Sequence, residues 1–524
     1  MQDILVKGGS IIDGSGNSAY KGDLVIKNGL ITIIEDLEKE ADLIIDATGL
    51  IVAPGFIDTH SHSDLYLIHA PEVLPKVMQG ITTEIIGQDG LSEAPIREDV
   101  KQEWRKYLSG LNGDPPIEWT WNTFSEYLSS IEEARPSVNV ASLVGHGNLR
   151  LLAIGMGNRD PSSRELSLMK ELLSESLKQG AFGLSTGLIY APCVYSKAFE
   201  LLELCKETTK HEGIFVVHMR NEGDALLKSI DEVLGIGKDS GIHVHISHFK
   251  VGGKANWGKS RSSLGELDKA TAQGLKVSFD QYPYTAGSTF LSSLLPAWVH
   301  EGGVDKLLER LRDNSTRSKV VLDLSTKVQS RATGWDTVLV TYVASKRNKI
   351  LEGLSLFEIA EKRGQTEIDA LIDIVLEEEN QASMASFTMN EEDVERIIAH
   401  PLGMICTDGL LLGKPHPRVY GAFPRILGHY VRKSVLRLEE AVRKMTGYPA
   451  QVFKLEKRGL IKSGYYADIT IFNPNTVQDT ATYKEPRKYP EGIHHVIVNG
   501  KLTVHDNQFT GERAGKVLMH KIFS

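Results

Sequence analysis

The chain has 524 residues, of which 41% are hydrophobic and 24% are charged, and its formal net charge is −9. This length suits a large domain with an accessory domain, and the composition is that of an ordinary globular protein. The acidic balance argues against nucleic acid as a partner. The sequence contains no apolar run long enough to span a membrane, no secretory signal and only three cysteines. We therefore expect a cytoplasmic protein without a membrane partner or a disulfide framework.

Both ends of the chain are predicted to form short strands that are separated by turns. Asn28-Gly29 near the start and Asn499-Gly500 near the end are dipeptides typical of hairpin turns, and each lies between strand-like runs. Because the termini of a domain often lie close together, we expect residues 1–54 and 455–524 to form one small β domain.

Residues 55–454 follow a different rhythm, in which apolar strand-like runs alternate with amphipathic helices. In the clearest helix Ser162 and Glu165 form a capping box, and Gly180 ends it. Alternation of this kind predicts an α/β fold with a parallel sheet. Eight runs favour a closed (β/α)8 barrel of the TIM type over the alternative, a doubly wound open sheet. The eight runs are Gly55–His60, Ile81–Gly87, Val138–His146, Ala181–Thr186, Ile214–His218, His243–His248, Leu275–Asp280 and Gly403–Asp408.

The stretch between Asp280 and Gly403 is too long for a single crossover connection. Long excursions between elements are usually lids or binding loops. We expect residues 288–345 to form an inserted lid or small subdomain before the last barrel strand.

The motif His60-Ser61-His62 lies at the end of the first run. Side chains alternate between the two faces of a strand, so His60 and His62 point the same way. Two neutral imidazoles side by side suit a borderline metal such as Zn²⁺. Two polar histidines in an ordinary loop are the alternative.

Two more histidines, His218 and His248, end later runs. His248 shares a face with apolar residues of its run, whereas His243 and His245 lie on the other face. We therefore expect His248 to point inward and the other two to be structural. Enzymes built on such barrels have their active sites at the carboxyl ends of the strands. Four histidines at those ends therefore predict a metal site.

Asp408 ends the eighth run and is followed by Gly409. A carboxylate at this position is suited to act as general base on a metal-activated water. A turn-capping Asp-Gly pair is the alternative.

Together these residues resemble the amidohydrolase superfamily, and within it the N-acyl-D-amino-acid deacylase (D-aminoacylase) family. The resemblance covers nearly the whole chain, and its motifs are specific jointly rather than singly. The motifs are PGFIDTHSHSD at 54–64, STGLIYAPC at 185–193, VVHMRNEG at 216–223, ISHFK at 246–250, YPYTAGSTFL at 282–291, TDG at 407–409 and HPRVYGAFPRILG at 416–428.

The resemblance implies a distorted (β/α)8 barrel with a small β-sandwich domain from both termini and an insertion before the last barrel strand. It also implies roles for named side chains. The implied metal ligands are His60, His62, His218 and His248, and the implied catalytic acid and base is Asp408. Tyr190 is implied to polarise the scissile carbonyl. Tyr282, Ser288 and Arg418 are implied to hold the substrate α-carboxylate, for which an arginine fork is well suited. His416 is expected beside the same pocket.

One position departs from the family pattern. Relatives carry a metal-bridging cysteine after the second strand, and here Asp89 occupies that place. A carboxylate can also ligate or bridge Zn²⁺, so we expect Asp89 to be a ligand, although it could instead only shape the turn. The harder oxygen ligand would also admit Mn²⁺ or Co²⁺. Whether one or two ions bind stays open.

The expected function is metal-dependent hydrolysis of N-acyl-D-amino acids, small molecules with a free α-carboxylate. A dipeptidase that releases a C-terminal D-residue, or a cyclic amidase of the hydantoinase or dihydroorotase type, is an alternative with the same apparatus. A non-enzymatic scaffold is less favoured, because the four histidines and Asp408 are all present. D-selectivity comes from the resemblance alone, and whether the protein forms a homo-oligomer stays open.

Overall fold

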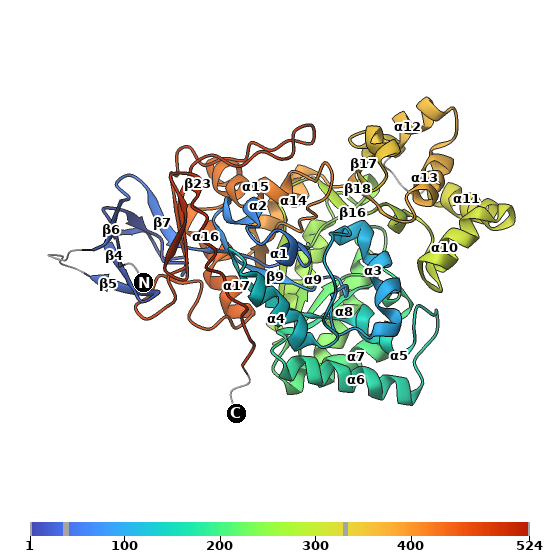
Figure 1. Ribbon diagram of the computed structural model, residues 1–524, viewed down its shortest axis with the longest axis horizontal. Coiled ribbons are helices and arrows are strands. Elements are labelled where there is room, and N and C mark those ends of the chain that lie inside the picture. The colour runs from blue at the N-terminus through green and yellow to red at the C-terminus, as the bar shows by residue number, and fades with distance from the viewer. Residues whose placement is uncertain (1–2, 35–40, 329–333, 522–524) are drawn as a thin grey trace.

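The structure is a computed structural model that describes residues 3–34, 41–328 and 334–521 (Figure 1). The predicted ranges 1–54, 288–345 and 455–524 each include a few residues outside this description. The fold is mixed α/β. Within the described residues, no helix has the length and apolar character needed to cross a bilayer.

Strands from both ends of the chain lie together, blue and red in Figure 1. A four-stranded sheet contains β1 (Ile4–Lys7), β4 (Asp23–Lys27), β5 (Leu30–Ile34) and β6 (Leu43–Asp46). A seven-stranded sheet joins β2 (Ser10–Ile11), β3 (Tyr20–Lys21) and β7 (Ile51–Pro54) to β20 (Ile469–Phe472), β21 (Ile493–Val498), β22 (Lys501–His505) and β23 (Gln508–Phe509). Side chains of both sheets, such as Leu24 and Ile469, pack in one hydrophobic cluster. Strand β7, from the first part of the chain, pairs antiparallel with β20, from the last part.

All eight predicted strands of the middle region form, the third of them in two pieces. They are β8 (Phe56–Asp58), β9 (Ile81–Ile86), β10 (Asn139–Ser142) with β11 (Val144–Gly145), β12 (Gly183–Gly187), β13 (Ile214–His218), β14 (His243–Ile246), β15 (Val277–Gln281) and β19 (Gly403–Ile405). Neighbours pair in parallel in the orders β8-β9-β10 and β11-β12-β13-β14-β15-β19. A parallel bridge also joins Ser61 to Gly409. Parallel pairing brings the carboxyl ends of these strands to one edge.

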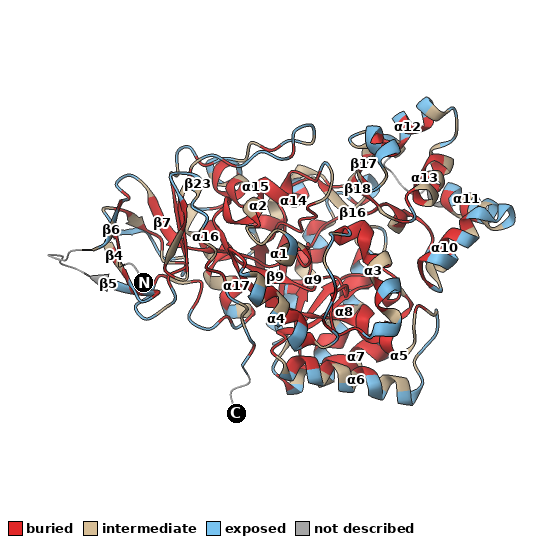
Figure 2. Cartoon of the chain, in the orientation of Figure 1, coloured by how far each residue is buried: buried red, intermediate tan, exposed pale blue. Residues whose placement is uncertain are grey.

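Helices pack against these strands. The predicted helix forms as α6 (Ser163–Lys178), with the capping box of Ser162 and Glu165, and it buries Met169 and Leu173 while its outer face is exposed (Figure 2). The other α-helices of this region, apart from those in the excursion between β15 and β19, are α1 (Tyr66–His69), α2 (Leu74–Val77), α3 (Glu98–Asn112), α4 (Phe124–Ala134), α5 (His146–Ala153), α7 (Ala198–Lys210), α8 (Leu226–Ser240), α9 (Ser260–Ala272), α14 (Glu391–Ala399), α15 (Arg418–Arg425), α16 (Leu438–Met445) and α17 (Gly447–Val452).

The excursion between β15 and β19 builds a sheet of its own. Strands β16 (Ala286–Phe290), β18 (Ala382–Phe387) and β17 (Val338–Val343) pair antiparallel in that order. Helices α10 (Gly303–Arg312), α11 (Asn314–Val328), α12 (Leu356–Arg363) and α13 (Glu367–Glu377) accompany this sheet and share a separate hydrophobic cluster with it. Since β18 ends at Phe387, the excursion extends well beyond the predicted range 288–345.

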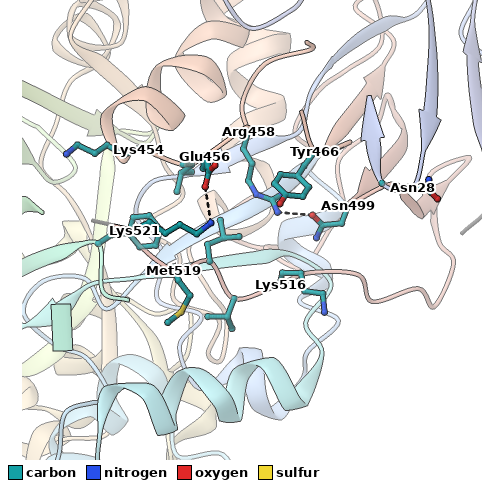
Figure 3. Close-up of a pocket in the computed structure, with 14 residues that line it drawn as sticks. Asn28, Lys454, Glu456, Arg458, Tyr466, Asn499, Lys516, Met519 and Lys521 are labelled. Carbon is teal, nitrogen blue, oxygen red and sulfur yellow. Dashed lines mark hydrogen bonds and ion pairs between the residues drawn. The ribbon is translucent and has the colours of Figure 1, made fainter. Parts of the chain in front are cut away.

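The C-terminal segment returns to the amino ends of the parallel strands. Leu518 N donates to Val140 O at 2.7 Å, and the His520 ring packs on Phe182, just before β12. Figure 3 shows the cavity beside this segment, where Lys521 pairs with Glu456 at 3.2 Å. This cavity lies at the end of the strands opposite to the one that carries the predicted site residues.

A buried network built around Lys76 of α2 ties the first and last parallel strands together. Lys76 Nζ donates to Asp58 Oδ2 at 2.7 Å and to Thr407 Oγ1 at 2.8 Å, and it lies 3.3 Å from Glu84 Oε2. The lysine and both carboxylates are fully buried. Burial by itself would lower the pKa of Lys76, but Asp58 and Glu84 outweigh it and raise the pKa, so the ammonium stays charged.

Replacing Lys76 by methionine should therefore destabilise the protein strongly. The variant leaves two buried carboxylates without their cation, a loss that costs about 3–5 kcal/mol in buried ion pairs. Chemical denaturation of Lys76→Met measures it. The control is Lys269→Met, which removes an exposed pair with Glu266 and should cost much less. Equal losses in both variants would contradict the importance of the network.

Candidate functional site

His60 and His62 follow β8 and face the same side, as their spacing predicts. Their Nε2 atoms lie 3.3 Å apart, and both side chains are buried. The carboxylate of Asp89, which follows β9, lies 3.6 Å from each of these nitrogens. Asp408 Oδ1, which follows β19, lies 3.3 Å from His62 Nε2 and 3.7 Å from His60 Nε2.

The second pair of histidines also approaches Asp89, at the same oxygen as His60. Asp89 Oδ1 lies 3.8 Å from His218 Nδ1 and 3.6 Å from His248 Nε2. The rings of His218 and His248 meet edge to face, with their centroids 4.4 Å apart. One buried carboxylate thus lies among four imidazoles that come from three different strand ends.

Backbone conformation at three of these positions is unusual. Asp89, His248 and Asp408 have φ values of 58°, 37° and 47°, in the left-handed region that L-residues with side chains rarely adopt. Such conformations cost of order 1–3 kcal/mol each and persist only where the surroundings impose them. Each comes two or three residues after a strand end, where the chain reverses and its side chain faces the common centre.

The residues present fit a divalent cation. Several buried polar atoms have no hydrogen-bond partner: Nδ1 of His60 and His62, both ring nitrogens of His218, and Asp89 Oδ1. Leaving such atoms unpaired is costly, and a cation at the centre would satisfy Asp89 Oδ1 and one ring nitrogen of His218. His60 and His62 would bind it through Nε2, the nitrogen that faces Asp89. Ligand atoms held tetrahedrally at 2.0–2.1 Å from Zn²⁺ lie about 3.3 Å from one another. The observed separations of 3.3–3.8 Å are close to this value. Imidazole and carboxylate are both zinc ligands.

The electrostatics of the centre favour ionised carboxylates and act on the imidazoles in opposite directions. Burial acts to lower the pKa of His60 and of His248, but the neighbouring carboxylates outweigh it and raise both, that of His248 to about 10. Burial acts to raise the pKa of Asp408, but the Arg418 guanidinium and His60 outweigh it and hold the pKa well below its usual range. Burial also opposes ionisation of Asp89, and His60 with the other imidazoles again lowers its pKa. Burial lowers the pKa of His62 and of His218, which leaves their nitrogens free to act as ligands.

The predicted substrate-binding residues surround Asp408. Arg418, the first residue of α15, is fully buried, with Nη1 2.9 Å from Asp408 Oδ2 and the guanidinium 4.3 Å from the centre of the Tyr282 ring. Arg418 Nη2 donates to the carbonyl oxygen of Ser288 at 3.1 Å. The Tyr190 hydroxyl lies 2.7 Å from Thr289 Oγ1, and its ring packs on His218.

One cavity opens onto this centre, and eight of the ten predicted site residues line it. These eight are His62, Asp89, Tyr190, His218, His248, Tyr282, Ser288 and Asp408. His60 and Arg418 are fully buried directly behind them. His416 also lies behind the wall, where its Nε2 contacts Ala286 O and the Tyr483 hydroxyl, each at 3.0 Å.

The sequence reasoning missed three charged residues at the site. Lys250 and Glu222 line the cavity, with Lys250 Nζ 2.6 Å from Glu222 Oε1. Glu222 Oε1 also lies 3.1 Å from His248 Nδ1. Asp280 is buried and accepts a hydrogen bond from the backbone N–H of His248. All three lie in or directly beside runs and motifs quoted above, but their spacing alone gives no signal of these long-range contacts.

The prediction that His243 and His245 are structural agrees with their contacts. Nε2 of His245 lies 2.9 Å from Asp280 Oδ2, and Nδ1 lies 2.9 Å from Ser278 Oγ. Nε2 of His243 lies 2.9 Å from the same hydroxyl. His245 therefore holds Asp280, which in turn holds the backbone of His248.

Comparison with known proteins agrees with this arrangement. The sequence pattern of the amidohydrolase family matches residues 43–504 of this chain. D-aminoacylase of Alcaligenes xylosoxydans xylosoxydans is 36% identical, over 98% of this chain and 97% of the relative. N-acyl-D-aspartate deacylase of the same organism is also 36% identical, over 98% and 95%.

Solved structures give the same result. The crystal structure of N-acyl-D-glutamate deacylase from Bordetella bronchiseptica, complexed with zinc and a phosphonate inhibitor that mimics the tetrahedral intermediate, is 34% identical. It superposes with a TM-score of 0.86 over 99% of this chain and 100% of the other. The crystal structure of D-aminoacylase has a TM-score of 0.83 at 35% identity, over 99% and 100%. The chain therefore belongs to the amidohydrolase family, in the group that contains the D-aminoacylases.

Proposed function

We propose that this protein hydrolyses the amide bond of N-acyl-D-amino acids to a carboxylate and a free D-amino acid. The observation that carries the proposal is the convergence of His60, His62, His218 and His248 around Asp89, with Asp408 beside them. Relatives that span nearly the whole chain are named D-aminoacylase, N-acyl-D-glutamate deacylase and N-acyl-D-aspartate deacylase.

We assign the metal to His60, His62, Asp89, His218 and His248. A divalent cation bound there supplies Lewis-acid activation of water and of the scissile carbonyl. The Bordetella bronchiseptica relative binds zinc, and D-aminoacylase has a binuclear metal centre. The place of Asp89 among four histidines supports one or two ions, and its oxygen ligands suit Mn²⁺ and Co²⁺ as well as Zn²⁺.

Asp408 and Tyr190 carry the proton and charge movements in this proposal. Asp408, kept ionised by its neighbours, accepts a proton from the attacking water as the water oxygen bonds to the amide carbon. When the carbon–nitrogen bond breaks, Asp408 delivers that proton to the leaving amine. Burial raises the pKa of Tyr190 well above its usual value, so its hydroxyl stays protonated and can donate to the developing oxyanion. Removing such a donor costs about 3–4 kcal/mol in other enzymes.

Arg418, Tyr282 and Ser288 are proposed to hold the substrate α-carboxylate, with Lys250 beside them. Arg418 Nε and the Tyr282 hydroxyl are buried without hydrogen-bond partners, which leaves donors free for an anion. Lys250 adds a positive charge to the cavity wall. A free α-carboxylate favours N-acyl amino acids, or dipeptides with a C-terminal D-residue, over cyclic amides.

For the fold we propose a distorted (β/α)8 barrel over residues 55–454 and a small β-sandwich over 1–54 and 455–524. Support for the barrel comes from the two parallel sheets and the Ser61–Gly409 bridge, which would close the circle. Support for the sandwich comes from the hydrophobic cluster that the two terminal sheets share. We also propose a cytoplasmic location, since Cys193, Cys205 and Cys406 are buried and unpaired.

The variant Asp408→Asn should retain the metal and lose nearly all turnover. An amide has a similar shape but cannot take up the proton, so kcat should fall at least about a hundredfold. Assays with N-acetyl-D-methionine, together with metal analysis of the same sample, measure both quantities. The control is Asp479→Asn, which removes a carboxylate that pairs with Arg425 of α15 rather than with the centre. Near-normal kcat in Asp408→Asn would remove this residue from the mechanism.

Removing the metal should abolish activity and lower thermal stability. The five buried side chains that bind the metal would lose it. A metal ion that binds only the folded state raises the melting temperature of the protein. Dialysis against a chelator, followed by calorimetry and addition of Zn²⁺, Mn²⁺ or Co²⁺, tests this. Activity and melting temperature should return together. Full activity in protein that metal analysis finds free of metal would contradict the proposal.

A further inference from the structure

Outside the metal centre, the charged side chains of the described cavity wall are Lys250 and Glu222, which pair with each other, and the other lining residues are uncharged. From this wall we infer that the preferred substrates are N-acyl-D-amino acids with neutral side chains, and that D-glutamate and D-aspartate derivatives are excluded. This inference rests on the proposed function and adds the substrate class. Relatives named D-aminoacylase, N-acyl-D-glutamate deacylase and N-acyl-D-aspartate deacylase are each 36% identical to this chain, so overall identity does not choose among these substrates.

The cationic side chains at the cavity already pair with carboxylates of the protein. Lys250 is the only lysine or arginine among the described residues that line the cavity. Its Nζ lies 2.6 Å from Glu222 Oε1 and 2.6 Å from His248 Nδ1. Arg418, behind the wall, faces Asp408 at 2.9 Å. Both cations are also assigned to the α-carboxylate. A second carboxylate on the substrate would find no cation left to receive it.

The rest of the described wall consists of apolar and hydroxyl side chains. Leu111 near the end of α3, Ile189 after β12 and Met384 of β18 supply apolar surface. Ser293, Ser386 and Thr388 supply hydroxyl groups from the excursion between β15 and β19. Whichever part of this wall the substrate side chain meets, it meets a neutral surface.

The carboxylates of the wall reinforce this selection. Glu222 faces the cavity from one side, and Asp89 and Asp408 face it from the metal centre. A side-chain carboxylate would lose its hydration and approach like charges, which is strongly unfavourable without a partner. An apolar side chain loses nothing on entry and gains contact with Leu111 and Met384.

The experiment compares kcat/KM of the metal-loaded enzyme for N-acetyl-D-methionine and N-acetyl-D-leucine with that for N-acetyl-D-glutamate and N-acetyl-D-aspartate. We expect the neutral substrates to be preferred at least about a hundredfold. Equal or higher kcat/KM for either acidic substrate would overturn the inference and leave the proposed function standing. Absence of hydrolysis of all four would overturn the proposed function and the inference with it.

Two lysine variants test whether this wall selects the side chain. Met384→Lys places a cation of similar length on the wall and should shift the acidic-to-neutral ratio of kcat/KM at least about tenfold toward the acidic substrates. Met384→Leu is the matched control and should keep the preference for neutral substrates. Ser386→Lys, at a half-buried position of the same strand, repeats the test if Met384→Lys fails to fold. A folded lysine variant with the original ratio would contradict the assignment.

Discussion

The carboxylate of Asp89, buried among imidazoles, is the constraint on which the rest of the site depends. Asp89 Oδ1 has ring nitrogens of His60, His248 and His218 within 3.6–3.8 Å, and no hydrogen bond satisfies it. A buried carboxylate in such surroundings requires positive charge. A bound cation supplies that charge and also explains why strand ends far apart in sequence converge there, and why left-handed backbone is retained at three positions.

Chemistry and selection are divided between two parts of the fold. Histidines and Asp408 stand at the ends of parallel strands, where the ladder fixes their backbone and Asp280 adds a further anchor. Much of the remaining wall comes from the excursion between β15 and β19, through β16, β18 and the residues around them. This division is consistent with a group whose members share a reaction and differ in the amino acid they accept.

Much of this organisation can be predicted from the sequence, because local patterns encode it. The eight strands are apolar runs, the α6 cap is a four-residue signal, and the spacing of His60 and His62 fixes their common direction. Other features rest on contacts that no local pattern encodes. Lys76 meets Thr407 across 331 residues, and Asp280 meets Thr59 across 221. The excursion exceeds its predicted range because it includes β18, and no local sequence pattern shows that β18 pairs with the distant strand β16.

The most direct test of the central claim is anomalous X-ray diffraction from crystals of the metal-loaded protein, recorded on both sides of the zinc absorption edge. The account predicts an anomalous peak about 2.0–2.2 Å from the ring nitrogens of the histidine pairs and from an oxygen of Asp89. A fully loaded crystal with no peak among His60, His62, His218 and His248, or with zinc bound only elsewhere, would contradict it.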